Sequence, residues 1–315
     1  MTSENTNPAA TQAQTPSKAK IWFRATRPFS FTASMIPCVL GAMLALLVYN
    51  GNSLWYLLPF IMLSSLLLHA ATNLVSDYYD FIKGVDTKDS MGGSGVLVEG
   101  LLKPRQVFNA GVLFFAIAFA LGLPIIFARG ELILVLGIVG ILGGFFYTGW
   151  PIGYKYVALG NFFVFILMGP LMVVGTFYAL TGHYMADVLY ISLPIGCLVA
   201  GILQANNLRD IGHDKDAHIK TLANVAGSSY AKAEYLTLII GAYVIVIALV
   251  LLKILSPWAL IVLLSLPPAI KNMNQIKGVQ VDNTAKIAML DVQTAQLHLL
   301  FGLLLSVSVL ISKFV

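Results

Sequence analysis

The sequence contains little charge and very little cysteine. Of its 315 residues only 10% are Asp, Glu, Lys or Arg, against roughly 25% in ordinary soluble domains. The two cysteines, Cys38 and Cys197, lie inside apolar stretches, so the sequence offers neither a disulfide framework nor a zinc cluster. With 58% hydrophobic residues and a mean hydropathy of +0.84, this composition excludes a soluble globular domain.

Long, continuous apolar segments make up most of the chain. A membrane-spanning helix needs about 20 predominantly apolar residues, whereas a transmembrane barrel would show short segments of alternating hydrophobicity. The sequence therefore predicts an all-α, polytopic membrane helix bundle of about nine transmembrane helices. The predicted spans are 29–49, 55–76, 107–128, 131–149, 158–181, 187–206, 235–252, 257–271 and 290–312.

The first 20 residues differ from the rest of the chain. Residues 1–20 are polar, rich in Thr, Ala, Gln and Pro, and contain no apolar core. They are not typical of a cleaved signal peptide, and they are predicted to form a disordered polar tail. The transmembrane domain is then expected to cover residues 21–315.

The basic residues are distributed unevenly between the two sides of the predicted bundle. With the N-terminus in the cytoplasm, all but three of the 19 Lys and Arg fall in inner segments, and the three outside are Arg129, Lys253 and Lys313. This bias follows the positive-inside rule, which explains the net charge of +5 better than a nucleic-acid partner does. We expect a multi-pass protein of the cytoplasmic membrane with its N-terminus and its acid-bearing loops in the cytoplasm.

The 14 acidic residues are few and clustered. Two groups begin at the inner ends of the second and sixth spans, and both repeat the pattern Asn-x3-Asp. At about 100° per residue, the members of each group share one face of a helix. The groups are Asn73, Asp77 and Asp80 in the second span and Asn206, Asp210 and Asp214 in the sixth. A weak internal duplication and chance both remain open as the origin of the repeat.

Several ionised carboxylates close to hydrocarbon repel one another and need positive compensation. Mg²⁺ prefers carboxylate and amide oxygens and usually bridges to substrate phosphates. Two such clusters at one membrane face therefore predict metal ions with a diphosphate between them. The simpler alternative is that these residues only cap helices or lie in solvated loops. The basic residues that could contact phosphate are Lys83, Lys88, Arg209, Lys215 and Lys220.

Five stretches of the sequence resemble a known family. The segments NLVSDYYDFIKGVD at 73–86 and NNLRDIGHDKDAHIKTLA at 206–223 resemble the two aspartate-rich motifs of the UbiA superfamily of intramembrane prenyltransferases. Within it, the chain is most similar to the 1,4-dihydroxy-2-naphthoate prenyltransferases of menaquinone synthesis. The stretches that carry this second likeness are 24–28, 147–151 and 160–178.

The resemblance implies roles for individual residues of these motifs. Those expected to be catalytic and to bind Mg²⁺ are Asp77, Asp80, Asp210 and Asp214. Those expected to contact the diphosphate are Asn73, Lys83, Asn206, Arg209 and Lys220. Tyr147 is expected near the reacting centre as a further catalytic residue, although a tyrosine of the interfacial aromatic belt is the alternative. The chain departs from the family pattern at Ser76, where Asn is usual, and at Gly84, where an acid is usual and Asp86 follows two residues later.

The implied reaction is electrophilic alkylation of an aromatic ring. A polyprenyl diphosphate in the lipid bilayer is expected to donate its polyprenyl group to an aromatic acceptor. The expected acceptor is 1,4-dihydroxy-2-naphthoate, which would lose CO₂ and give demethylmenaquinone. Another ring, such as 4-hydroxybenzoate, is the alternative within this class. An ion-coupled transporter is the alternative from a different class, although it predicts acids near mid-span rather than at the inner ends.

Two further features leave alternatives open. The Gly-rich segment 91–95 (MGGSG) could close over the diphosphate as a lid, or it could be a flexible linker. His69 lies in the second span, two turns before Asp77. It could contact a substrate, or it could satisfy a polar group of a neighbouring helix.

Overall fold

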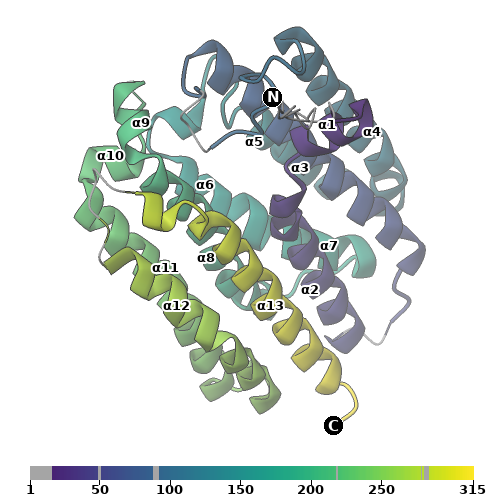
Figure 1. Cartoon of the computed structure of the whole chain (residues 1–315). Helices are drawn as coiled ribbons and strands as arrows, with labels where there is room; N and C mark the ends of the chain where they lie inside the picture. Colours follow the sequence, from purple (N-terminus) through teal and green to yellow (C-terminus); the bar gives the residue numbers. More distant parts are fainter. Residues whose placement is uncertain (1–15, 49–50, 88–91, 218, 278, 280–283) are drawn as a thin grey trace, which may run out of the picture.

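The structure is a computed structural model that describes residues 16–48, 51–87, 92–217, 219–277, 279 and 284–315. Its regular elements are helices (Figure 1), which confirms the all-α prediction. Within these ranges the β-pairing is one isolated bridge between Val157 and Lys220.

Most helices follow one another along the chain with short connections, whereas a longer segment, residues 83–103, joins α3 to α4. They are α1 (Lys18–Ala25), η1 (Pro28–Phe31), α2 (Thr32–Val48), η2 (Trp55–Leu57), α3 (Leu58–Ile82), α4 (Pro104–Arg129), α5 (Glu131–Phe145), η3 (Tyr154–Tyr156), α6 (Gly160–Ile166), η4 (Leu167–Leu171), α7 (Met172–Thr181), α8 (Ala186–Arg209), α9 (Ile211–Asp216), α10 (Leu222–Ala226), α11 (Ser228–Leu251), η5 (Pro257–Ser265), α12 (Leu266–Lys277), η6 (Ala285–Ile287) and α13 (Leu290–Ile311).

Each predicted apolar span coincides with helical structure. Seven helical segments of the described chain are long and apolar enough to cross a membrane. They begin at Pro28, Trp55, Pro104, Gly160, Ala186, Ser228 and Leu290. The other two predicted spans are α5, which has 15 residues, and η5 with α12, which follow one another directly. The protein is therefore a multi-pass membrane protein.

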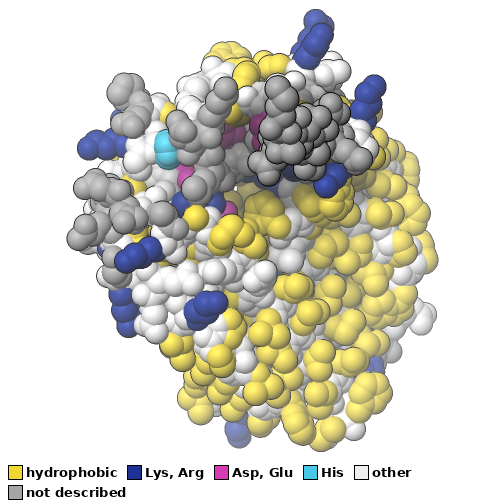
Figure 2. All heavy atoms as spheres, viewed as in Figure 1, with side chains coloured by type: hydrophobic (Ala, Val, Ile, Leu, Met, Phe, Trp, Pro, Cys, Tyr) yellow, Lys and Arg dark blue, Asp and Glu magenta, His cyan; other side chains and the backbone are white. Residues whose placement is uncertain are grey.

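The surface divides into an apolar part and a charged end. Figure 2 shows hydrophobic side chains over most of the lower part of the molecule, whereas the visible acids and many of the basic side chains lie at the upper end. The short helices α1, α9 and α10 lie at this same end (Figure 1). Because α1 begins at Lys18, residues 18–20 of the predicted tail are helical. Residues 1–15 of that tail lie outside the described residues.

The spacing of the second acidic motif predicts one continuous helix, but the structure divides the motif between α8 and α9. Helix α8 ends at Arg209, and Asp210 lies between α8 and α9 with φ −94° and ψ 9°. The backbone N–H of Asp214 still donates to the carbonyl of Asp210 at 2.9 Å. The chain thus bends at Asp210 but keeps one helical turn between the two acids.

Close packing at glycine positions brings helices of the bundle together. A Cβ built on Gly169 of η4 would lie 2.5 Å from the Cα of Gly196 on α8, so these two backbones touch. Small residues allow such contacts between membrane helices. Large buried side chains such as Phe177 of α7, Tyr235 of α11 and Phe301 of α13 belong to the main hydrophobic core.

Candidate active site

The first acidic motif lies in the last two turns of α3, where Asp77 and Asp80 are both buried. Asp77 is ion-paired with Arg27 and accepts a hydrogen bond from the hydroxyl of Ser94. Asp80 accepts from the ammonium of Lys155 at 2.7 Å and from the hydroxyl of Tyr156 at 2.8 Å. Each carboxylate is therefore matched by a cation from a distant part of the chain.

Ser76, the departure from the family pattern, also contacts this motif. Its hydroxyl donates to the Oδ2 atom of Asp80 at 3.0 Å. The chain then turns back at Gly84, which has φ +71°, a conformation that glycine adopts readily. The N–H groups of Val85 and Asp86 both donate to the carbonyl of Asp80, and this turn places Asp86 beside the motif. Burial and the charge of Asp80 raise the pKa of Asp86 to about 6.

The second acidic motif is held by one buried arginine. Arg209 pairs with Asp210 at 2.8 Å and with Asp291 of α13 at 2.6 Å, and it also donates to the side-chain oxygen of Asn206. Asp214 is buried one turn further along. Burial raises the pKa of Asp214 to about 7, although the positive charge of Lys155 opposes the shift.

The loop that follows the first motif connects the two acid groups. A Cβ on Gly92 would lie 2.9 Å from the Oδ2 atom of Asp210, and a Cβ on Gly93 would lie 2.2 Å from the Oδ2 atom of Asp86. The next residue, Ser94, bonds to Asp77. Consecutive residues of this loop thus contact both motifs. Met91, the first residue of the Gly-rich segment, lies outside the described residues.

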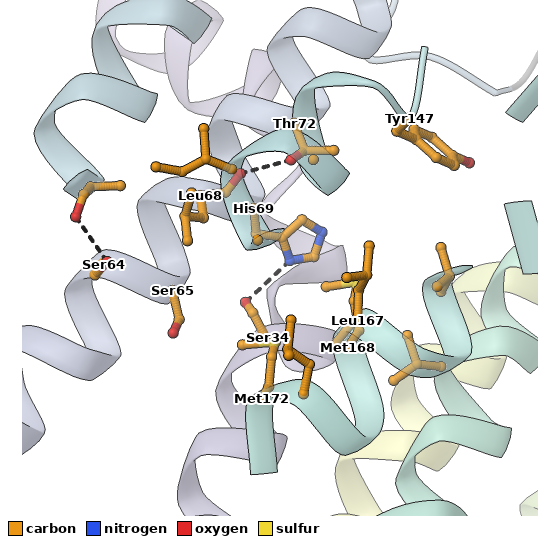
Figure 3. Close-up of a pocket in the computed structure, with 18 of the residues that line it drawn as sticks. Ser34, Ser64, Ser65, Leu68, His69, Thr72, Tyr147, Leu167, Met168 and Met172 are labelled. Carbon is orange, nitrogen blue, oxygen red and sulfur yellow. Dashed lines mark hydrogen bonds between the residues drawn. The ribbon is translucent and has the colours of Figure 1, made fainter. Parts of the chain in front are cut away.

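A cavity of about 340 Å³ extends from the acid groups into the helix bundle. Asn73, Ser76 and Asn206 line its polar end, together with Arg27 and Asp291. Its deeper walls are mostly apolar, with side chains from α3, α4, α5, η4 and α7 (Figure 3). The site therefore combines a charged mouth with an apolar chamber.

The predicted diphosphate contacts occupy different positions relative to this cavity. Asn73 lines it while donating to the carbonyl of Thr26 at 3.0 Å. The ammonium of Lys83 lies 3.7 Å from the centre of the Tyr156 ring. Lys220 is exposed, and its backbone N–H donates to the carbonyl of Tyr156 at 3.3 Å. Arg209 is engaged by two carboxylates.

Tyr147, expected near the reacting centre, lines the cavity and is labelled in Figure 3. It follows α5 at the same end of the bundle as the acids, and its ring lies 5.5 Å from that of Tyr154. An aromatic wall therefore adjoins the charged mouth.

Sequence reasoning missed the cations that neutralise the first motif. Lys155 is separated from Asp80 by 75 residues, and Arg27 from Asp77 by 50. The sequence analysis counted Lys155 only among the basic residues of the inner segments and gave Asp291 no role. The available signal was that Lys155 is the one Lys or Arg between α5 and α6. Isolated cations in short loops beside acidic motifs are candidates for such pairs.

Residues 34–290 match the UbiA prenyltransferase family. The chain belongs to this family. Membership removes the transporter alternative and makes the protein a membrane prenyltransferase.

Two relatives and one solved structure extend the comparison. The 1,4-dihydroxy-2-naphthoate octaprenyltransferase of Bacillus subtilis (strain 168) is 35% identical over 315 residues, which is 100% of both chains. UbiA prenyltransferase domain-containing protein 1 of Homo sapiens is 32% identical over 291 residues, covering 91% of this chain and 82% of its own. A UbiA homolog from Archaeoglobus fulgidus, bound to GPP and Mg²⁺, has a TM-score of 0.60 at 17% identity, with 91% of this chain and 99% of that chain covered. This last likeness shows the shared fold.

The donor atoms of this UbiA-family site suit a magnesium ion. They are oxygens of carboxylates and amides, which are hard ligands. Within the described residues, no group of three Asp, Glu, His or Cys side chains could hold a metal ion by itself. Mg²⁺ commonly uses one or two carboxylates together with waters and substrate phosphates. The paired motifs therefore fit Mg²⁺ that arrives with a diphosphate.

Proposed function

We propose that this prenyltransferase transfers a polyprenyl group from a polyprenyl diphosphate to 1,4-dihydroxy-2-naphthoate, with loss of CO₂ and formation of demethylmenaquinone. The full-length identity of 35% to the Bacillus subtilis octaprenyltransferase carries the choice of acceptor. The charged mouth beside an apolar chamber supports a substrate that has a diphosphate head and a hydrocarbon tail. A different ring, such as 4-hydroxybenzoate, is the second candidate in the same class.

The two acidic motifs are proposed to hold Mg²⁺ through Asp77, Asp80, Asp210 and Asp214. When bound there, Mg²⁺ supplies positive charge that stabilises the departing diphosphate. Asn73 and Asn206 line the same end of the cavity and are proposed to orient the phosphate oxygens. Lys83 and Lys220 are proposed as further contacts from its rim.

Arg27 and Lys155 are proposed to exchange partners when substrate binds. In the structure they neutralise Asp77 and Asp80. With Mg²⁺ held by Asp77 and Asp80, the guanidinium and ammonium would be available to the phosphate oxygens, and such charge-assisted contacts are strong. Burial lowers the pKa of the Lys155 ammonium, but the charge of Asp80 outweighs burial, so the pKa lies above its ordinary value. Lys155 is therefore protonated while it is paired with Asp80.

The apolar chamber is proposed to receive the polyprenyl chain and to exclude water. As the bond from carbon to diphosphate oxygen breaks, the allylic cation must react with the aromatic ring before it reacts with water. The aromatic side chain of Tyr147 lines the chamber near the acids and is proposed to face the reacting carbon.

The charged end is proposed to face the cytoplasm, together with the N-terminus. The excess of Lys and Arg in the predicted inner segments supports this orientation, and α1, α9 and α10 lie at the same end of the bundle (Figure 1).

The test is a prenyl-transfer assay in nanodiscs with 1,4-dihydroxy-2-naphthoate and a labelled polyprenyl diphosphate, with and without Mg²⁺. We expect a prenylated product and an equal amount of CO₂, both dependent on Mg²⁺. A product formed with 4-hydroxybenzoate and none with the naphthoate would refute the acceptor assignment. Turnover that is unchanged in the presence of a chelator would refute the magnesium site.

A further inference from the structure

One wall of the cavity carries polar side chains deeper in the helix bundle than the acid groups. Ser30 of η1, Ser34 of α2 and His69 of α3 all line the cavity, and Figure 3 shows His69 bonded to Ser34. Leu167 and Met168 line the cavity from the other side of this cluster (Figure 3). The chamber thus has one face that can form hydrogen bonds and another that cannot.

A polyprenyl chain does not account for the polar wall. The chain is a hydrocarbon, and polar groups that face it gain no hydrogen bonds to offset their loss of water. The second substrate of an aromatic prenyltransferase carries oxygen atoms on its ring. It must also lie beside the carbon that leaves the diphosphate, since reacting atoms approach to about 3–3.5 Å.

The position of the wall agrees with that requirement. Asn73 and His69 precede Asp77 by four and eight residues on α3. At 1.5 Å per residue, these separations are about 6 and 12 Å along the helix axis. Asn73 also donates to Ser30 at 3.1 Å, so the acid groups and the polar wall are continuous.

The hydrogen bonds around His69 are one hydrogen short. Ser30 Oγ lies 2.8 Å from the carbonyl oxygen of Arg27 and 3.2 Å from Nε2 of His69. Ser34 Oγ lies 3.1 Å from the carbonyl oxygen of Phe31 and 3.1 Å from Nδ1 of His69. These are four contacts, whereas two hydroxyls and a neutral imidazole carry three hydrogens. One acceptor of the cluster, the unprotonated ring nitrogen of His69 or a backbone carbonyl, therefore receives no hydrogen from the cluster, and the hydroxyl of a ligand in the cavity can donate to it.

We propose that Ser30, Ser34 and His69 bind a ring hydroxyl of the aromatic acceptor, which donates the missing hydrogen. The inference rests on the proposed function and names the acceptor subsite within the cavity. The ring then lies between this polar wall and the apolar wall, with its reactive carbon toward the acid groups.

A structural role for the same cluster makes a different prediction. Asn73 also bonds to the carbonyl of Thr26, so the cluster connects η1 to α3. If that were its whole role, substitutions would weaken the binding of all ligands equally. If the cluster binds a hydroxyl, the substitutions would remove only the tighter binding of ligands that carry a hydroxyl.

The experiment measures equilibrium binding without turnover. The probes are two hydroxynaphthoates, with the hydroxyl at ring position 1 or position 4 of 2-naphthoate, and the methyl ether of each. One neutral hydrogen bond is worth roughly 1 kcal/mol, so methylation of the recognised hydroxyl should weaken binding to the wild-type protein by about fivefold. In His69→Leu, the hydroxynaphthoate and its ether should bind within about twofold of each other.

Two further variants keep the test decisive. His69→Phe removes both ring nitrogens but keeps a planar ring, so the advantage of the hydroxyl should also disappear. Ser64→Ala is the matched control, because Ser64 lines the same cavity but donates to the carbonyl of Ala118 at 2.9 Å. This control should retain the wild-type difference.

The outcomes separate this inference from the proposed function. Equal binding of hydroxyl and ether probes by the wild-type protein would overturn the inference, as would an unchanged difference in both His69→Leu and His69→Phe. Because binding is measured without turnover, failure to form a prenylated naphthoate would refute the proposed function while leaving hydroxyl-dependent binding as a separate result.

Discussion

Replacing Lys155 by methionine is expected to cost far more stability than breaking a surface ion pair. Lys155 and Asp80 are paired at 2.7 Å, and their side chains are only 12% and 1% exposed. Methionine keeps the length of the side chain but removes its charge, which leaves the carboxylate with only the hydroxyls of Ser76 and Tyr156. Breaking a buried pair in this way typically costs about 3–5 kcal/mol.

The exposed pair between Arg24 and Glu99 provides the matched control. Its side chains are 41% and 52% exposed, and such pairs contribute about 0–1 kcal/mol. The midpoint of thermal unfolding, measured in detergent without Mg²⁺, should therefore fall strongly in Lys155→Met and little in Glu99→Gln.

The double variant Asp80→Asn with Lys155→Met tests the cause. Removing both charges eliminates the unpaired buried carboxylate, so most of the lost stability should return. Activity should remain absent, since Asp80 is a proposed metal ligand. If the double variant unfolds at the same temperature as Lys155→Met, or below it, the argument from an unpaired buried charge is wrong.

Three other predictions concern the charged end of the cavity. Asp77→Ala and Asp210→Ala should each abolish prenyl transfer in the nanodisc assay while the protein still elutes as a monodisperse peak, and near wild-type activity in either would refute the metal site. Because burial raises the pKa of Asp214 to about 7, the folded protein holds this proton more tightly than the unfolded chain. Without Mg²⁺, unfolding midpoints should therefore fall as the pH rises from about 4 to 7, and Asp214→Asn should flatten that slope. Gly93→Ala adds a Cβ that would lie 2.2 Å from a carboxylate oxygen, whereas a Cβ on Gly212 meets nothing within 4 Å. Gly93→Ala should reduce kcat at least tenfold, and Gly212→Ala should leave it unchanged.

The membrane helices could be predicted because hydropathy is a local property. Each predicted span coincides with helical structure, since a run of apolar residues in a bilayer must satisfy its backbone hydrogen bonds within the segment. Helix ends were less predictable. Helix α3 continues through Asp80 to Ile82, and α8 stops at Arg209.

The acidic motifs could also be located from the sequence, but their surroundings could not. Spacing alone put Asp77 and Asp80 on one face of α3. It could not indicate that Arg209 is already engaged by Asp291 from the last membrane helix, 82 residues away.

The sequence by itself determined the membrane helices, the two acidic motifs and the resemblance to a prenyltransferase family, since these follow from hydropathy, spacing and residue type along the chain. Only the tertiary structure decided that Lys155 neutralises Asp80, that the loop at 92–94 contacts both motifs, and that His69 faces a cavity. The physical reason is that each of these contacts joins elements far apart in the chain, and the packing of whole helices fixes which side chains meet.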